Sequence, residues 1–179
     1  MARGSSEIVA AAGLQMCRWA LQNVSMAEYA IREDDLTGPE IAALLHLHLD
    51  EMHRWSPPES VHALPIERLR QPDVTFFSAW DGNRLAACGA IKQLGATHGE
   101  LKSMRADPAW RGRGAGKAVL AHLLMVARAR GYTRVSLETG KPDRFLPARR
   151  LYESHGFVPC PAFGDYVEDQ FSMCMTLQL

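Results

Sequence analysis

Apolar residues along this chain recur with two periods, and the two periods predict different elements. Between Ile41 and Met52, and again between Val119 and Ala127, apolar residues recur every three or four positions, which predicts two helices with one buried face each. Shorter segments rich in apolar residues alternate with polar ones and predict strands. The predicted strands are Tyr29–Arg32, Asp73–Trp80, Arg84–Ile91, Glu100–Ala106, Thr133–Thr139, Phe157–Cys160 and Gln170–Leu177. Two shorter helices are predicted at Leu64–Leu69 and Arg149–His155.

The connections between these segments set the strand directions. Asp81–Asn83 reads as a tight hairpin turn, so the strands that flank it run antiparallel. A helix crosses over between Glu100–Ala106 and Thr133–Thr139, and such a crossover makes two strands parallel. The expected fold is an α/β domain of the α+β kind, with a mixed and mostly antiparallel sheet. Thr37 is a plausible N-cap for the first helix.

A glycine-rich segment, Arg111–Gly116, joins the strand Glu100–Ala106 to the helix that follows it. A strand that turns through glycines into a helix leaves several backbone N–H groups unpaired and directed at one place. The helix dipole adds partial positive charge there, and Arg111 and Arg113 add charged donors. The segment therefore predicts a phosphate or pyrophosphate site.

Two common phosphate motifs do not fit this spacing. The P-loop of ATPases needs a glycine where Arg111 stands and a Ser or Thr where Ala118 stands. The dinucleotide-binding fingerprint needs its third glycine at Lys117. Both requirements fail, so an ATPase is a poor alternative.

Two motifs together resemble the GNAT superfamily of N-acetyltransferases. They are Met104–Gly116, which contains the Arg-x-x-Gly-x-Gly spacing of its acyl-CoA pyrophosphate loop, and Ala148–Phe157, which contains its Leu-Tyr helix and Gly-Phe end. They occur in the family's order, about 40 residues apart, within a domain expected over residues 26–179. The resemblance implies a sheet that splays between its fourth and fifth strands, with helices on both faces.

The resemblance also implies acetyl-CoA as the cosubstrate, with its pantetheine arm pairing along the main chain of the fourth strand. The residues expected to bind it are Met104, Arg105, Ala106, Arg111, Gly112, Arg113, Gly114, Ala115, Gly116 and Lys117.

For the chemistry, the resemblance points to Tyr152 as the acid that protonates the departing thiolate; the alternative is a tyrosine that only packs. Glu100 matches a position used as general base in some members, with a strand-end ion pair as the alternative, and Glu138 is the reserve candidate. The family often has an Asn seven residues before the tyrosine, but here the residue is Phe145. That departure suggests a helix that starts differently.

Composition excludes several classes of partner. The 179 residues suit one domain, and the formal net charge of zero gives no electrostatic argument for binding nucleic acid or an anionic membrane. No apolar run is long enough to span a bilayer. The four cysteines form no C-x-x-C pair and suit a reducing, cytoplasmic setting. Residues 1–25 are expected to form a loosely attached leader helix rather than a signal peptide.

Three histidines in or just past the first helix raise the question of a metal site. His46 and His48 project roughly 200° apart on a helix, so they cannot share a ligand face, and no metal is expected. The following connector, Trp55–Ser60, is either a wall of the acceptor pocket, as the resemblance implies, or a plain rigid link.

The predicted activity is direct transfer of an acetyl group from acetyl-CoA to a primary amine of a small molecule. A protein or peptide N-acetyltransferase and a non-catalytic acyl-CoA-sensing module are the alternatives. A homodimer through the C-terminal strands is compatible with the apolar face of Phe171–Leu177, although the sequence does not require it.

Overall fold

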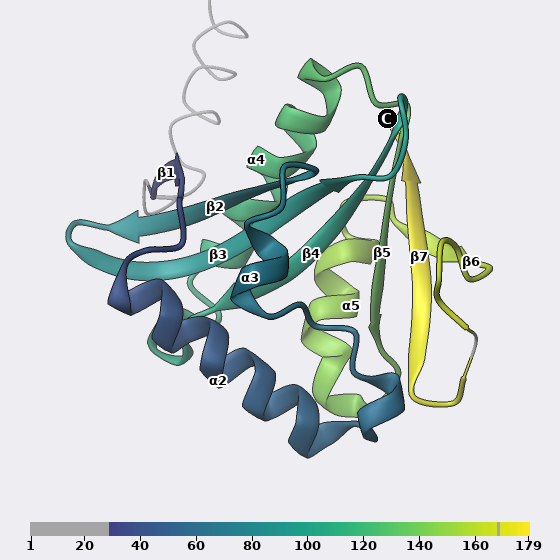
Figure 1. The fold of residues 1–179 in the computed structure, drawn as a ribbon, viewed down its shortest axis with the longest axis horizontal. Coiled ribbons are helices and arrows are strands. Elements are labelled where there is room, and N and C mark those ends of the chain that lie inside the picture. Colours follow the sequence, from purple (N-terminus) through teal and green to yellow (C-terminus); the bar gives the residue numbers. More distant parts are fainter. Residues whose placement is uncertain (1–28, 168) are drawn as a thin grey trace, which may run out of the picture.

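A seven-stranded sheet forms the centre of the protein, in the strand order β1-β2-β3-β4-β5-β7-β6 (Figure 1). The computed structural model describes residues 29–167 and 169–179, so the predicted leader over residues 1–25 lies outside the described residues. The strands are β1 (Ala30–Glu33), β2 (Val74–Asp81), β3 (Arg84–Gln93), β4 (His98–Ala106), β5 (Arg134–Gly140), β6 (Val158–Cys160) and β7 (Ser172–Gln178). The α-helices are α2 (Pro39–Trp55), α3 (Ile66–Leu69), α4 (Ala115–Ala129) and α5 (Leu146–Glu153). Short 3₁₀ turns are η1 (Pro58–Ser60), η2 (Pro108–Trp110) and η3 (Asp143–Phe145).

The expected sheet directions are confirmed. Every neighbouring pair of strands is antiparallel except β4 and β5, which run parallel. Their ladder ends at the pair Leu101 and Leu137, although both strands continue beyond it. The sheet therefore splays between its fourth and fifth strands.

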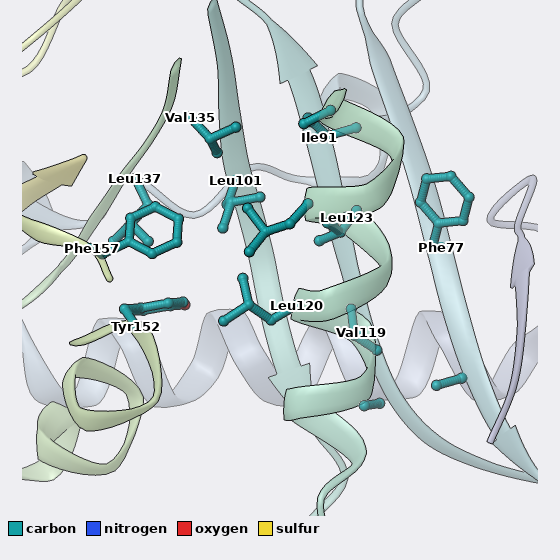
Figure 2. Packing of buried hydrophobic residues seen from close by; sticks show 14 of the residues in the cluster. Phe77, Ile91, Leu101, Val119, Leu120, Leu123, Val135, Leu137, Tyr152 and Phe157 are labelled. Atoms are coloured by element: carbon teal, nitrogen blue, oxygen red, sulfur yellow. The ribbon is translucent and has the colours of Figure 1, made fainter. Parts of the chain in front are cut away.

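Helices cover both faces of the sheet, and each face has its own hydrophobic core. The α4 and α5 face holds a cluster in which Leu120 and Leu123 pack near Leu101 and Tyr152 (Figure 2). The opposite face holds a second cluster, built around α2 and α3. Side chains alternate between the two faces along a strand, so the neighbours Phe77 and Phe76 of β2 belong to the first and the second cluster respectively.

A β-bulge in β4 determines which side chains reach the face that carries α2. Cys88 pairs with Arg105 and Ala90 with Lys102, so Gly89 faces two residues of β4. Ser103 has a positive φ of 51° there. Residues three apart on a regular strand point to opposite faces, yet Lys102 bonds to the carbonyl of His62 and Arg105 to Glu51 of α2. The bulge thus places both cations on the α2 face.

Two local predictions were wrong. The N-cap of α2 is Gly38 rather than Thr37, because the helix begins at Pro39, and no side chain caps it. Helix α5 starts at Leu146, three residues earlier than predicted, with Pro147 in its first turn, where proline is tolerated.

The C-terminal strand β7 lies inside the sheet, between β5 and β6. The edge on this side is therefore β6. A dimer contact through the C-terminal strands stays a prediction.

Candidate functional site

A cavity of about 790 Å³ opens where β4 and β5 part. This volume is in the range of small-molecule and cofactor sites. Its walls come from seven parts of the chain. They are the C-terminal half of α2, the connector that follows it, β4 from Leu101 to Ala106, the glycine-rich loop with the start of α4, the end of β5, the segment from Arg144 to Tyr152, and Phe171 before β7. The connector Trp55–Ser60 is thus part of the wall of the cavity, and His62 after it lines the cavity too.

The glycine-rich loop forms one end of this cavity. Gly112 and Gly114 have φ values of 75° and 89°, a conformation that other residues rarely adopt. A Cβ atom built on either glycine would meet no protein atom within 4 Å. Their backbone therefore faces open space, as close approach by a ligand requires.

The start of α4 is arranged for an anion. Its N-cap, Gly114, has no side chain that caps the helix, and the first turn carries no acidic residue. The first N–H groups of a helix have no partner within it and carry partial positive charge. Gly116 and Lys117 line the cavity in this turn, and the Lys117 side chain adds a full positive charge.

Beyond Leu101, the edge of β4 that faces β5 has no strand partner within residues 29–167 and 169–179, whereas its other edge remains paired with β3. Met104, Arg105 and Ala106 line the cavity along this open edge. The predicted cofactor residues on β4 therefore line the cavity, as do those of the loop and the helix start other than Arg113.

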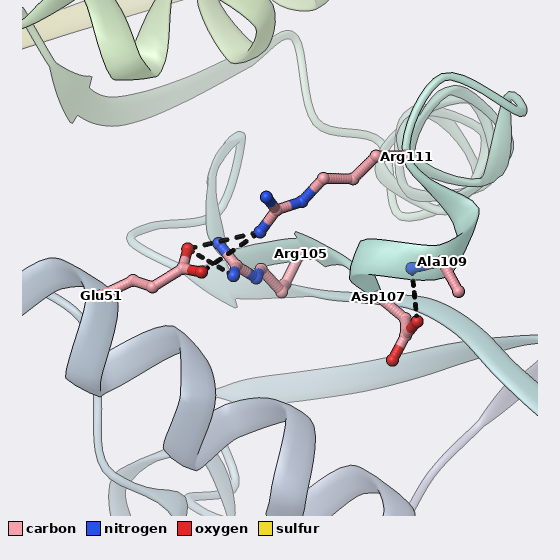
Figure 3. A network of polar contacts seen from close by, with 5 residues as sticks. All are labelled: Glu51, Arg105, Asp107, Ala109 and Arg111. Carbon is pink, nitrogen blue, oxygen red and sulfur yellow. Dashed lines mark hydrogen bonds and ion pairs between the residues drawn. The ribbon is translucent and has the colours of Figure 1, made fainter.

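Two of the predicted arginines share a carboxylate that the sequence analysis missed (Figure 3). Arg105 Nη2 lies 2.5 Å from Glu51 Oε2 on α2, and Arg111 Nη2 lies 3.3 Å from both carboxylate oxygens. Burial opposes ionisation of Glu51, but the two guanidinium groups outweigh it and lower the pKa of this carboxyl. Arg105 is buried by the pair, whereas half of the Arg111 side chain stays exposed at the cavity.

Arg113 is the one predicted cofactor residue that does not line the cavity. Its N–H donates to the carbonyl of Trp110, and its own carbonyl accepts the Tyr29 hydroxyl at 3.0 Å. Through these two bonds, the main chain of Arg113 stabilises the glycine-rich loop.

Tyr152 lines the cavity from α5 and is largely buried. Its ring packs edge-on against Phe157, with 5.8 Å between the ring centroids. Burial raises the pKa of its phenol well above the usual range, and the charge of Glu138 adds to the shift. The hydroxyl is therefore protonated at neutral pH and available as a donor.

Glu100 is not a wall of the cavity but part of a buried polar cluster beside it. It forms an ion pair with Lys102, whose Nζ lies 3.3 Å away, and accepts the hydroxyl of Tyr166. Lys102 also donates to Tyr166 at 2.5 Å and to the carbonyl of His62 at 3.2 Å. Tyr166 comes from the segment before β7, and no motif marked it.

Glu138 does line the cavity, near the end of β5. Burial raises the pKa of its carboxyl to about 7, against the opposing charge of Lys102. A carboxyl with such a pKa exchanges protons near neutral pH. Of the two predicted carboxylates, Glu138 is the one placed to meet a ligand.

Phe145, which replaces the family's usual Asn, contributes an aromatic wall. Its ring lies against the backbone of Gly140, where a Cβ atom would collide with it, and edge-on to Trp55 at 5.8 Å. Both rings line the cavity. The wall thus joins the end of β5 to the end of α2.

Comparison with known proteins gives a consistent result. A sequence model described as the acetyltransferase (GNAT) family matches residues 41–157. The uncharacterized N-acetyltransferase YsnE of Bacillus subtilis (strain 168) is 52% identical over 149 residues, which are 83% of this chain and 99% of YsnE. YedL of Escherichia coli (strain K12), also described as an uncharacterized N-acetyltransferase, is 46% identical over 84% of this chain and 95% of its own. More distantly, an IAA acetyltransferase of Azospirillum brasilense is 31% identical over 87% of this chain and 97% of its own.

Solved structures share the fold. A crystal structure from Klebsiella pneumoniae, described as a candidate acyl-CoA N-acyltransferase, superposes with a TM-score of 0.69 at 29% identity over 86% of this chain and 99% of that one. A GNAT family acetyltransferase from Elizabethkingia anophelis, solved with acetyl-CoA bound, superposes with a TM-score of 0.63 at 17% identity over 84% and 98% of the two chains.

Proposed function

The chain belongs to the acetyltransferase (GNAT) family and is an N-acetyltransferase, and from that premise we propose that it moves the acetyl group of acetyl-CoA directly to a primary amine of a small molecule. The observation that carries this proposal is the gap between β4 and β5, which ends at an open glycine turn and an uncapped helix start. A gap of this kind suits a long polar arm that ends in a pyrophosphate.

The described residues fit acetyl-CoA at both ends of that arm. Structural relatives bind acetyl-CoA, and here the backbone at Gly112, Gly114 and Gly116 would hold the pyrophosphate, with Arg111 and Lys117 as charged donors. The open edge of β4 at Met104 and Ala106 would pair with the pantetheine amides. Acetyl-CoA supplies an activated acetyl thioester, whose transfer to the amine forms a C–N bond and breaks the C–S bond.

The protein's contribution to the chemistry is to move two protons. Glu138 accepts the proton that the amine loses, because its carboxylate lines the cavity and its pKa, about 7, matches the working pH. Tyr152 donates a proton to the departing thiolate, because its phenol stays protonated in its buried position. Glu100, bonded to Lys102 and Tyr166, is the alternative base and would act through an intervening group.

A small acceptor is favoured over a protein by the walls of the cavity. Ser60 of the connector and His62 after it line the cavity, and the rings of Trp55 and Phe145 form an aromatic part of its wall. The name of the Azospirillum relative, an IAA acetyltransferase, also gives a small molecule. The identity of the amine does not follow from either observation.

The proposal is tested by following CoA thiol release from acetyl-CoA with the purified protein. Three sets of acceptors are compared: free amines, peptides with free N-termini, and intact proteins. Amine-dependent release that is fastest with free amines supports the proposal. Faster acetylation of peptides or proteins would overturn the small-molecule assignment, and acetyl-CoA binding without release on any acceptor would favour the sensing module.

A further inference from the structure

Three buried polar atoms have no hydrogen-bond partner within the described part of the chain, and all three belong to residues that line the same cavity. They are Nδ1 of His48, Oγ of Ser103 and Nε of Arg105. Buried donors and acceptors are nearly always paired in folded proteins, since an unpaired one loses its bonds to water. Three such atoms around one cavity indicate the place of a ligand's polar group.

His48 reaches this place because of its position on α2. It follows Ile41 and Leu45 along the buried stripe of the helix, whereas His46 is exposed. Burial, aided by the charge of Arg105, lowers the pKa of His48 to about 4. The imidazole is therefore neutral at neutral pH, which suits it to recognise a ligand by a hydrogen bond rather than to act as a base.

The other two atoms are donors. Arg105 is held by Glu51 through Nη2, and this contact leaves its Nε–H unpaired. Ser103 sits at the bulge of β4, where its hydroxyl is buried. The charges that act on His48 are the cations Arg105 and Lys102 and the anion Glu51. The Nε–H of Arg105 belongs to a charged guanidinium, and a charged donor favours an oxygen that carries negative charge.

At the end of β5, by contrast, the cavity presents a carboxyl group. Glu138 lines it at the end of β5, where a carboxylate favours an amine. The arm of acetyl-CoA is expected to use the main-chain edge of β4, so that it would leave side chains on the α2 face of β4 unclaimed. The unpaired donors are therefore available to the acceptor.

We propose that His48, Ser103 and Arg105 form a subsite for a carboxylate of the acceptor, so that the substrate class is an amine that also carries a carboxylate. This inference rests on the proposed function and deepens it. An oxygen of bound acyl-CoA can accept the same hydrogen bonds as the carboxylate of the acceptor. The experiment distinguishes these two ligands.

The test compares matched acceptors that differ only in the carboxylate, such as phenylalanine with phenethylamine and lysine with cadaverine. The wild-type protein is expected to prefer at least one carboxylated member by about tenfold or more in kcat/KM, as a charge-assisted pair of bonds would give. His48→Leu replaces the imidazole with an apolar side chain of similar length. It should reduce that preference about fivefold or more and leave the KM for acetyl-CoA within about twofold. His48→Asn, which restores a side-chain donor, should recover part of the preference.

His46→Leu is the matched control, since it makes the same change on the exposed face of the same helix. It should leave the preference unchanged. A second readout does not depend on turnover: the ring resonance of His48 should shift in an NMR titration of the CoA-saturated protein with the carboxylated acceptor, and not with its decarboxylated partner.

The possible outcomes are distinct. Equal kcat/KM for the matched acceptors, or a preference that survives His48→Leu, would overturn the subsite. A rise in the KM for acetyl-CoA with the acceptor preference intact would assign the oxygen to acyl-CoA instead and would also overturn it. Failure of the proposed function would look different, since no amine would then release the thiol of CoA, whatever its carboxylate.

Discussion

The two ends of the cavity are built from different materials. At the end proposed for acetyl-CoA, called the cofactor end, the binding groups come mainly from the backbone: two glycines with positive φ, an uncapped helix start and a strand edge with no partner among the described residues. The end proposed for the amine is called the acceptor end. At the acceptor end, side chains from α2, the connector, β4 and β5 supply the polar groups. A backbone site tolerates many sequences as long as its glycines are kept, whereas each side chain at the acceptor end can be changed separately. This difference explains how one fold can retain a cosubstrate and vary its amine.

The two ends are also joined. Glu51 lies on α2 beside the acceptor end, yet its carboxylate holds Arg111 at the start of the cofactor loop (Figure 3). Arg105, on the strand between them, is bound to the same carboxylate. Changes at one end should therefore be tested for effects on the other.

The largest expected effect is a loss of acetyl-CoA affinity from a substitution at the cofactor end. Gly116→Glu would place a carboxylate at the first turn of α4, in the space proposed for the pyrophosphate, and should weaken acetyl-CoA binding by about 100-fold or more through like-charge repulsion. The fold should survive, because a Cβ atom on Gly116 meets only Leu151, at an ordinary 3.7 Å. Ala121→Glu adds the same charge on the exposed face of the same helix and serves as the control. Calorimetry measures both, and equal affinities would remove the loop from the account.

The next effect separates chemistry from binding. Tyr152→Phe removes the hydroxyl and keeps the ring that packs against Phe157. It should lower kcat by on the order of 100-fold, the usual size for loss of a general acid, with the KM for acetyl-CoA nearly unchanged. Steady-state kinetics at saturating amine are sufficient. Unchanged kcat would leave Tyr152 with a packing role only.

Glu138→Gln addresses the acceptor end, with an expected loss of roughly tenfold to 100-fold in kcat. In the wild type, kcat should rise with pH around a midpoint near 7, because the base acts only when it is deprotonated. The variant should lose this rise. If Glu100→Gln abolishes it instead, Glu100 is the base.

The same substitution has an opposite effect on stability. The pKa of Glu138 is raised by folding from 4.5 to about 7, so its stabilising contribution is full below pH 4.5 and is lost as the pH rises through 7. At pH 8 the wild type holds a buried charge that glutamine lacks. Glu138→Gln should then be more stable by about 3 kcal/mol, since one pKa unit corresponds to about 1.4 kcal/mol, and by much less at pH 4.5. Urea unfolding at the two pH values measures the difference, and a less stable variant at pH 8 would contradict it.

The smallest effect is expected at the contact between the two ends. Arg111→Gln should weaken acetyl-CoA binding about threefold to tenfold, because half of this side chain is exposed and its charge is screened by water. The loss should shrink at high salt. Binding isotherms at two ionic strengths test this, and a loss that is independent of salt would mean that Arg111 does not act through its charge.

The same contrast explains what the sequence could predict. The cofactor end follows from local spacing, because the turn and the helix start need glycines at fixed positions of one continuous segment, and a motif shows them. The acceptor end is assembled by tertiary contacts: Glu51 and Arg111 are 60 residues apart, and Tyr166 and Glu100 are 66 apart. No local pattern marks such pairs. His48 had a weak signal, because it continues the apolar stripe of α2, where a polar residue needs a reason.

Local chemistry also limited the prediction of element ends. Thr37 has a good capping side chain, but α2 begins one residue later than a cap at Thr37 requires, and the hydroxyl donates locally to Asp35. The sequence does not display the backbone geometry that sets this start. The early start of α5 follows from Pro147, which fits the first turn of a helix.

The most direct test of the central claim is calorimetric binding of acetyl-CoA to the purified protein, with ATP and NAD titrated separately. We expect micromolar affinity for acetyl-CoA and no comparable binding of either nucleotide, because the loop lacks the residues that ATP and dinucleotide motifs require. Absence of acetyl-CoA binding, or tighter binding of ATP or NAD, would contradict it.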